Sequence, residues 1–142
     1  MKLTFWLLDI NYEVKDHKPE VWLWGIDDKE NRVLVIDREF TPYFYAVLNE
    51  RANPESVIEL INARKNELPY IVKVEAVEKK YFGKKVKALK IYCQDPELLQ
   101  KYAKRIEKIE GVDKCLEDDI RYSMRYLIDN EVTPCGWHTL EA

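Results

Sequence analysis

Strand-forming residues dominate the first forty positions of the chain. Residues 4–10 (Thr-Phe-Trp-Leu-Leu-Asp-Ile) are an almost unbroken run of such residues, which is typical of a strand covered on both faces. Two shorter apolar runs follow at 21–26 and 33–36, and the polar stretch 27–31 between them predicts a turn. The chain is therefore predicted to open with a small β-meander.

Strand and helix signals alternate after residue 42. An apolar run at 43–48 predicts a strand, and Asn53 followed by Pro54 predicts the N-cap and first turn of a helix. We expect this helix to turn its apolar side chains inward, namely Val57, Leu60 and Ile61.

A long hairpin and a second helix complete this middle part. Residues 70–80 and 85–92 alternate apolar and charged side chains, and Gly83 supplies the turn between them. Asp95 and Pro96 then mark a helix start, and Gly111 marks its end. The apolar face of this helix is predicted to comprise Leu98, Leu99, Tyr102, Ile106 and Ile109.

A last short strand is predicted at 112–116. From residue 42 to residue 116 the order is then strand, helix, strand, strand, helix, strand, which is the split βαβ or ferredoxin-like plan. Residues 120–129 predict a short terminal helix with Ile120, Met124 and Leu127 inward, and 133–138 a loop leaving the domain. The expected fold class is α+β, with one domain over 1–130 and a linker over 131–142.

Composition limits the functions to consider. The chain has 142 residues, of which 46% are hydrophobic, and a formal net charge of −3, so any contact with nucleic acid has to come from a local basic patch. Its three cysteines show no Cys-x-x-Cys spacing, and no leading apolar segment resembles a signal peptide or a membrane span. We expect a soluble, reduced, cytoplasmic protein that does not contact membranes.

The residues that usually carry enzyme chemistry are sparse. His17 and His138 are the only histidines, so no catalytic residue is assigned. Cys135 and His138 have a spacing that suits zinc, but no second ligand pair accompanies them. The acidic pairs at 118–119 and 27–28 are better explained as a solvated corner and a turn, and no metal or cofactor is expected for this chain.

Two other residue groups suit nucleic acid. The hairpin lysines Lys79, Lys80, Lys84 and Lys85, with Lys87 and Lys90 further along, could meet phosphates, and guarding an exposed sheet edge explains them equally well. Aromatic residues could stack bases as in RNA-recognition modules, although core packing is the commoner role. Those modules carry a basic-Gly-aromatic pattern on the third strand, and residues 85–92 lack its glycine. These aromatic residues are Tyr12, Tyr43, Phe44, Tyr45, Tyr92 and Tyr122.

Four strings occur together in the order and spacing of a known family. They are residues 8–12 (Leu-Asp-Ile-Asn-Tyr), 40–46 (Phe-Thr-Pro-Tyr-Phe-Tyr-Ala), 77–84 (Val-Glu-Lys-Lys-Tyr-Phe-Gly-Lys) and 119–129 (Asp-Ile-Arg-Tyr-Ser-Met-Arg-Tyr-Leu-Ile-Asp). In these strings the chain resembles the N-terminal domain of archaeal family B DNA polymerases over essentially its whole length. The last string is the most specific.

The resemblance implies a non-catalytic piece of a replicative DNA-directed DNA polymerase. Nucleotidyl transfer, 3′-5′ exonuclease activity and the Mg that serves both would belong to domains that this chain lacks, and 131–142 would lead toward the exonuclease domain. The partners implied are single-stranded template DNA and the remaining domains of the polymerase.

Archaeal members of that family use this domain to capture uracil in the template strand. By position, the resemblance implies a pocket lined by Tyr12, Pro42, Pro96, Leu99, Ile120 and Tyr122, with Arg125 supporting its shape. An unstacked uracil would enter the slot, while cytosine would leave a polar group unmatched and thymine would be refused by its methyl group.

The chain departs from the family pattern at the expected pocket. Leu99 stands where Val is usual, Arg121 where Pro is usual, Tyr122 where Phe is usual, and Ala103 where many relatives have Arg. An extra methylene in a tight slot can cost about 1–3 kcal/mol. The alternative function class is a free-standing ferredoxin-like module for nucleic-acid binding or regulation.

Overall fold

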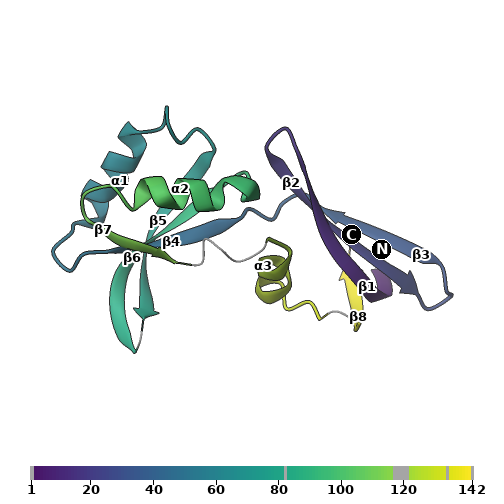
Figure 1. Cartoon of the computed structure of the whole chain (residues 1–142). Helices are drawn as coiled ribbons and strands as arrows, with labels where there is room; N and C mark the ends of the chain where they lie inside the picture. Colours follow the sequence, from purple (N-terminus) through teal and green to yellow (C-terminus); the bar gives the residue numbers. More distant parts are fainter. Residues whose placement is uncertain (1, 82, 117–121, 134, 142) are drawn as a thin grey trace. The chain divides into compact units, whose positions relative to one another are not determined.

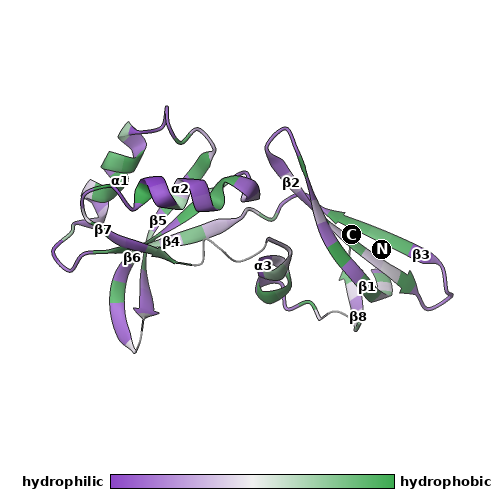
Figure 2. Ribbon diagram, in the orientation of Figure 1, coloured by the Kyte–Doolittle hydropathy of each residue, from purple (hydrophilic) through white to green (hydrophobic). Residues whose placement is uncertain are grey.

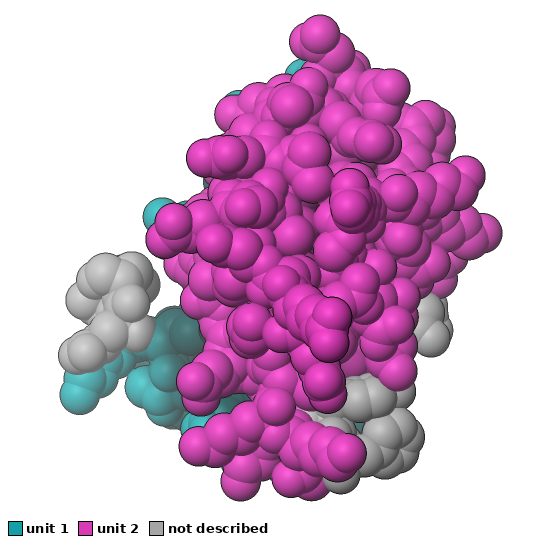
Figure 3. Space-filling view, turned by 90° about the vertical axis from the view of Figure 1, so that its left-hand side faces the viewer, with its two compact units in different colours: residues 1–40, 121–142 teal, residues 41–120 magenta. Residues whose placement is uncertain are grey.

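The chain forms two compact units, which Figure 3 colours separately. The structure, a computed structural model, describes residues 2–81, 83–116, 122–133 and 135–141. The first unit comprises residues 1–40 and 121–142, and the second comprises 41–120. The second unit is therefore inserted into the first along the chain. The sequence pattern predicts one domain over 1–130, and that domain boundary stays a prediction.

The first unit is built on a four-stranded antiparallel sheet in the order β3-β2-β1-β8 (Figure 1). Its strands are β1 (Lys2–Lys15), β2 (Lys18–Asp27), β3 (Arg32–Asp37) and β8 (Trp137–Glu141). The predicted meander is confirmed in the first three. The turn before β3 forms because the Asp27 carboxylate accepts hydrogen bonds from the amides of Lys29 and Asn31, at 2.9 and 2.8 Å.

Helix α3 (Tyr122–Asp129) belongs to the first unit and contacts β1. The sequence predicts Met124 and Leu127 inward; Leu127 does pack against the core of this unit, but Met124 is 50% exposed. The buried side chains of the helix are instead Tyr122, Arg125 and Tyr126. The large rings bury more apolar area than the methionine does, and they have hydroxyl partners on the sheet side. The prediction for Ile120 lies outside the described residues.

Two further expectations for the first unit are wrong. The β1 side chains alternate between faces, with Phe5 and Leu7 buried and Leu8 51% exposed, so this strand is covered on one face only. The loop predicted for 133–138 gives way at Trp137 to strand β8, which pairs with β1 from Lys2↔Glu141 to Trp6↔Trp137. The assignment of 131–142 as a linker in a longer protein stays a prediction.

The second unit confirms the ferredoxin-like plan (Figure 1). Its antiparallel sheet has the order β5-β6-β4-β7, with the first and third strands of the plan at the centre. The elements are β4 (Tyr43–Leu48), α1 (Pro54–Ala63), β5 (Ile71–Tyr81), β6 (Lys84–Cys93), a 3₁₀ turn (Pro96–Leu98), α2 (Leu99–Ile106) and β7 (Val112–Leu116).

Asn53 and Asp95 cap the start of α1 and of the 3₁₀ turn before α2, as the sequence predicts, but α2 ends at Ile106 and not near Gly111. The Asn53 side chain accepts a hydrogen bond from the Glu55 amide and the Asp95 side chain one from the Glu97 amide, each at 2.9 Å. One inward prediction is wrong, because Leu60 is 40% exposed while Val57 and Ile61 of the same helix are buried. Val57 and Ile61 lie four positions apart on one face, and Leu60 lies at its border.

The core of the second unit lies between its sheet and the two helices. It joins β4 and β6 side chains such as Phe44, Leu89 and Ile91 to helix side chains such as Ile61 and Ile106. The sheet face that carries these residues is therefore covered by helices.

Gly83 and Gly111 both have positive φ, at +78° and +97°, and they offer a matched pair for testing the packing of the second unit. A Cβ at Gly111 would lie 2.8 Å from Val57 Cγ2, whereas a Cβ at Gly83 would meet nothing within 4 Å. We predict that Gly83→Ala lowers the free energy of unfolding by about 1–2 kcal/mol through backbone strain alone. Gly111→Ala should cost a further 1–3 kcal/mol, roughly, through overpacking.

Urea unfolding followed by far-UV circular dichroism measures both losses, because α1 and α2 both belong to the second unit. Equal losses for the two variants would contradict the packing of Gly111 against Val57.

Candidate nucleic-acid interface

Aromatic rings from β1, α3 and the segment after β3 meet in the first unit. The Tyr12 and Tyr122 rings lie edge to face, with centroids 5.3 Å apart and planes at 83°. Phe40 lies 5.5 Å from Tyr122 and 5.2 Å from Tyr126. We call Tyr12, Phe40, Tyr122 and Tyr126 the tyrosine cluster.

The hydroxyls of the two helix tyrosines are bonded by the last residue of β3 and by the segment that follows it. Tyr126 donates a hydrogen bond to Asp37 Oδ2 at 2.8 Å, and Tyr122 donates one to the Phe40 carbonyl. Burial raises the pKa of both phenols well above the usual range, and the negative charge of Asp37 raises each pKa further. Both side chains are therefore neutral donors at ordinary pH.

Arg125 lies on the same helix, one turn after Tyr122, and only 6% of it is exposed. Burial of this side chain on the helix that carries Tyr122 suits the supporting role that the resemblance implies. The structure thus brings Tyr12 and Tyr122 of the expected site into contact, and it places Arg125 on the same helix as Tyr122.

The other described members of the expected pocket belong to the second unit. Pro42 is buried, Pro96 is half-buried at the start of the 3₁₀ turn, and Leu99 is 4% exposed within the core. A change at Leu99 therefore alters the core of the second unit as well as any slot beside it. Ile120 and Arg121 lie outside the described residues, so the complete pocket stays a prediction.

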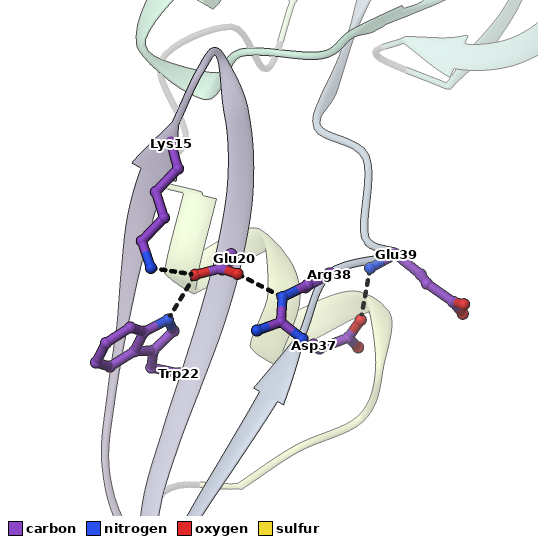
Figure 4. A network of polar contacts seen from close by, with 6 residues as sticks. All are labelled: Lys15, Glu20, Trp22, Asp37, Arg38 and Glu39. Carbon is purple, nitrogen blue, oxygen red and sulfur yellow. Dashed lines mark hydrogen bonds and ion pairs between the residues drawn. The ribbon is translucent and has the colours of Figure 1, made fainter.

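A polar network that sequence reasoning missed lies beside the tyrosine cluster, and Figure 4 shows it. Glu20 on β2 is buried, accepts a hydrogen bond from Arg38 Nε at 2.5 Å, and lies 3.5 Å from Lys15 Nζ. The hydrogen bond from Arg38 is the main cause that lowers the pKa of Glu20. The network thus joins β2 to Arg38. Arg38 follows Asp37, which bonds Tyr126, and precedes Phe40, whose carbonyl bonds Tyr122.

No short sequence motif predicts this network, because its main pair, Glu20 and Arg38, lies on different elements. The available sequence signal was an acidic residue within a predicted strand and a basic residue just after the next strand.

The four hairpin lysines do not form one patch. Lys80 pairs with Lys85 across the hairpin, while Lys79 pairs with Val86. Because side chains alternate along a strand, Lys79 and Lys84 belong to one face of the hairpin, and Lys80 and Lys85 belong to the other. Lys79 Nζ lies 4.0 Å from the centre of the Tyr45 ring.

Within residues 2–81, 83–116, 122–133 and 135–141 no three His, Cys, Asp or Glu side chains gather as metal ligands. His138 instead uses Nε2 to bond the Thr133 carbonyl at 2.8 Å. Among the same residues no helix is long and apolar enough to cross a membrane.

Comparison with known proteins finds relatives over nearly the whole chain. DNA polymerase 3 of Saccharolobus shibatae is 38% identical over 137 residues, which are 96% of this chain and 17% of that protein. DNA polymerase 2 of Aeropyrum pernix is 32% identical over 139 residues, which are 98% of this chain and 17% of that protein. No family model matches the chain.

Among solved structures, the family B DNA polymerase from the hyperthermophilic archaeon Pyrobaculum calidifontis matches with a TM-score of 0.85 and 36% identity. The match covers 99% of this chain and 18% of the polymerase chain. The chain thus spans less than a fifth of the length of these relatives.

The tyrosine cluster makes a pH-dependent prediction. Tyr126→Phe removes the hydrogen bond to Asp37 and should lower the free energy of unfolding near neutral pH by about 0.5–1.5 kcal/mol. A raised pKa in the folded state means that the contribution of Tyr126 is full below the unfolded pKa of about 10 and is lost as pH rises above it. The wild type should therefore lose stability more steeply than the variant above that pH.

Urea unfolding followed by tryptophan fluorescence measures this difference, since all four tryptophans belong to the first unit. Trp24→Phe, which keeps the other three fluorophores, is the control and should follow the wild-type slope. Parallel slopes for wild type and Tyr126→Phe above pH 10 would contradict a buried, neutral Tyr126.

Proposed function

Since the chain belongs, by sequence and by fold, with the N-terminal domains of archaeal family B DNA polymerases, we propose that its parent protein is a DNA-directed DNA polymerase. The family membership confirms the resemblance read from the sequence. In this proposal the chain binds the single-stranded template and catalyses no step itself. Polymerase and 3′-5′ exonuclease chemistry, with Mg held by carboxylates, would be carried by other domains of a cytoplasmic enzyme.

The observation that carries the proposal is a match that runs over 96–98% of this chain in relatives named DNA polymerases. A ferredoxin-like fold alone would suit the alternative, a free-standing nucleic-acid-binding or regulatory module, equally well. The match over the first unit and the second together favours the polymerase.

A primer-extension assay on the full-length protein tests the parent activity. We expect template-dependent extension that stops when EDTA removes the divalent metal. A full-length gene product that ends near residue 142 and extends no primer would favour the free-standing module.

We propose further that this domain recognises uracil in the template through the tyrosine cluster. The Tyr12 ring lies edge to face against Tyr122, whose hydroxyl is already bonded to a backbone carbonyl, so these side chains offer ring walls. Backbone groups near Ile120 and Tyr122 would then match the polar edge of uracil, and the Tyr12 wall would exclude the thymine methyl group.

Uracil selection predicts a ranking of three oligonucleotides that differ in one base. A single strand with one deoxyuridine should bind the 142-residue chain at least about fivefold more tightly than the same strand with thymidine or deoxycytidine, because a mismatched edge or methyl group costs about 1–3 kcal/mol. Fluorescence anisotropy at one salt concentration measures the three affinities. Tyr12→Ala should narrow the gap between uracil and thymine by opening the wall.

Trp24→Ala is the matched control, because Trp24 is an exposed ring of the same sheet that bonds Asn11 Oδ1 at 2.9 Å outside the tyrosine cluster. It should keep the uracil preference. Equal affinities for all three oligonucleotides would overturn uracil recognition by this domain. They would not contradict binding of the single-stranded template, which does not depend on the base.

A further inference from the structure

One face of the second unit's sheet is not covered by its helices. Phe44, Leu89 and Ile91 point into the core, so their neighbours along the strands point the opposite way. That opposite face carries Tyr43 and Tyr45 on β4, Lys90 and Tyr92 on β6 and Lys79 on β5, which we call the tyrosine–lysine face. The β5–β6 hairpin is drawn mostly in hydrophilic colours toward its tip (Figure 2).

Strand register brings these residues together. Tyr43 pairs with Tyr92 and Tyr45 pairs with Lys90 across β4 and β6. The Tyr43 ring lies 5.7 Å from Tyr45 and 5.8 Å from Tyr92. Three rings thus form one continuous row on the two central strands.

Ammonium groups lie over this row. Lys79 Nζ lies 4.0 Å from the Tyr45 ring centre, and Lys90 Nζ lies 4.1 Å from that of Tyr43 and 5.2 Å from that of Tyr92. Lys73 adds a third ammonium 5.9 Å from Tyr92, paired with Glu75 at 2.6 Å. The face is cationic although the chain as a whole has a net charge of −3.

We propose that the tyrosine–lysine face is a binding platform for a single-stranded nucleic acid, on which bases stack on the tyrosines and phosphates meet the lysines. This inference rests on the proposed single-strand binding and adds a second contact, separate from the uracil pocket. It needs no glycine-containing third-strand motif, because the rings come from β4 and β6 together.

The energetics favour an exchange of partners on binding. Tyr45 and Tyr92 are partly exposed, whereas Tyr43 between them is 8% exposed, so Tyr45 and Tyr92 are the rings on which bases would stack. A lysine over such a ring makes a weak cation–π contact, whereas a base stacked on it contributes more. A strand would therefore take the ring faces, and the displaced ammonium groups would lie beside its phosphates. Opposite charge and π-faces together fit a polynucleotide better than an acidic peptide, which has no bases to stack.

Two double variants separate the two kinds of contact. Lys79→Gln/Lys90→Gln should weaken binding of a labelled dT strand of about ten nucleotides and lower the slope of log K against log salt by about 1.4, since each phosphate contact contributes about 0.7 for single strands. Tyr45→Leu/Tyr92→Leu should weaken binding about tenfold or more without changing that slope. Fluorescence anisotropy at several salt concentrations measures both effects.

Lys101→Gln/Lys104→Gln is the matched control, because it removes the same charge from exposed positions of α2. It should keep the affinity and the slope close to those of the wild type. Equal losses in the control and in Lys79→Gln/Lys90→Gln would overturn the platform in favour of diffuse attraction. An unchanged affinity in Tyr45→Leu/Tyr92→Leu would also overturn it.

A parallel titration with an oligouridine RNA strand of the same length compares the affinity for RNA with that for DNA. Binding of either strand supports the platform. Absence of binding to both overturns it. Because the platform contacts every sequence alike, its loss lowers the affinity for deoxyuridine, thymidine and deoxycytidine strands together. Failure of the platform is thereby distinguishable from failure of uracil selection.

Discussion

The pairing of β8 with β1 is the interaction on which the first unit depends. It joins the two ends of the chain in one sheet, and it is extended by hydrogen bonds from Cys135 N to the Leu7 carbonyl and from Leu7 N to the Gly136 carbonyl, at 2.8 and 2.9 Å. Because the chain must return to β1, the segment before β8 is drawn onto the same sheet. That segment includes α3, so the return of the chain also supplies Tyr122, Arg125 and Tyr126.

The helix is held on the sheet by polar contacts with the end of β3 and the segment after it, in addition to apolar packing. Two tyrosine hydroxyls bond Asp37 and the Phe40 carbonyl, and Glu20 holds Arg38 between them. Buried hydroxyls and carboxylates are costly unless they are paired, so these contacts favour one arrangement of the helix over its alternatives. The tyrosine cluster can therefore present ring walls in a fixed geometry, as selection of one base requires.

The two units divide the proposed work between them. The first unit carries the tyrosine cluster proposed for uracil, and the second carries the tyrosine–lysine face proposed for any single strand. Both use tyrosine, but in the first unit the hydroxyls are bonded to the protein, whereas in the second the ring faces meet ammonium groups. The fixed rings of the first unit suit discrimination between bases. The ring faces and ammonium groups of the second unit suit binding that does not depend on base sequence.

The sequence by itself determined the elements that local chemistry controls. Asn53 caps α1, Asp95 caps the 3₁₀ turn before α2, and Gly83 forms the turn of the hairpin, because each signal acts between residues close in the chain. The order of strands and helices likewise predicted the ferredoxin-like sheet. The family resemblance also singled out Tyr12, Tyr122 and Arg125, and their role in a site stays a proposal. Only the tertiary structure decided that α3 buries its tyrosines rather than Met124, that Trp137–Glu141 form a strand, and that Lys79 lies over Tyr45. Each of these depends on strand register and burial between segments far apart in the chain, which no local pattern encodes.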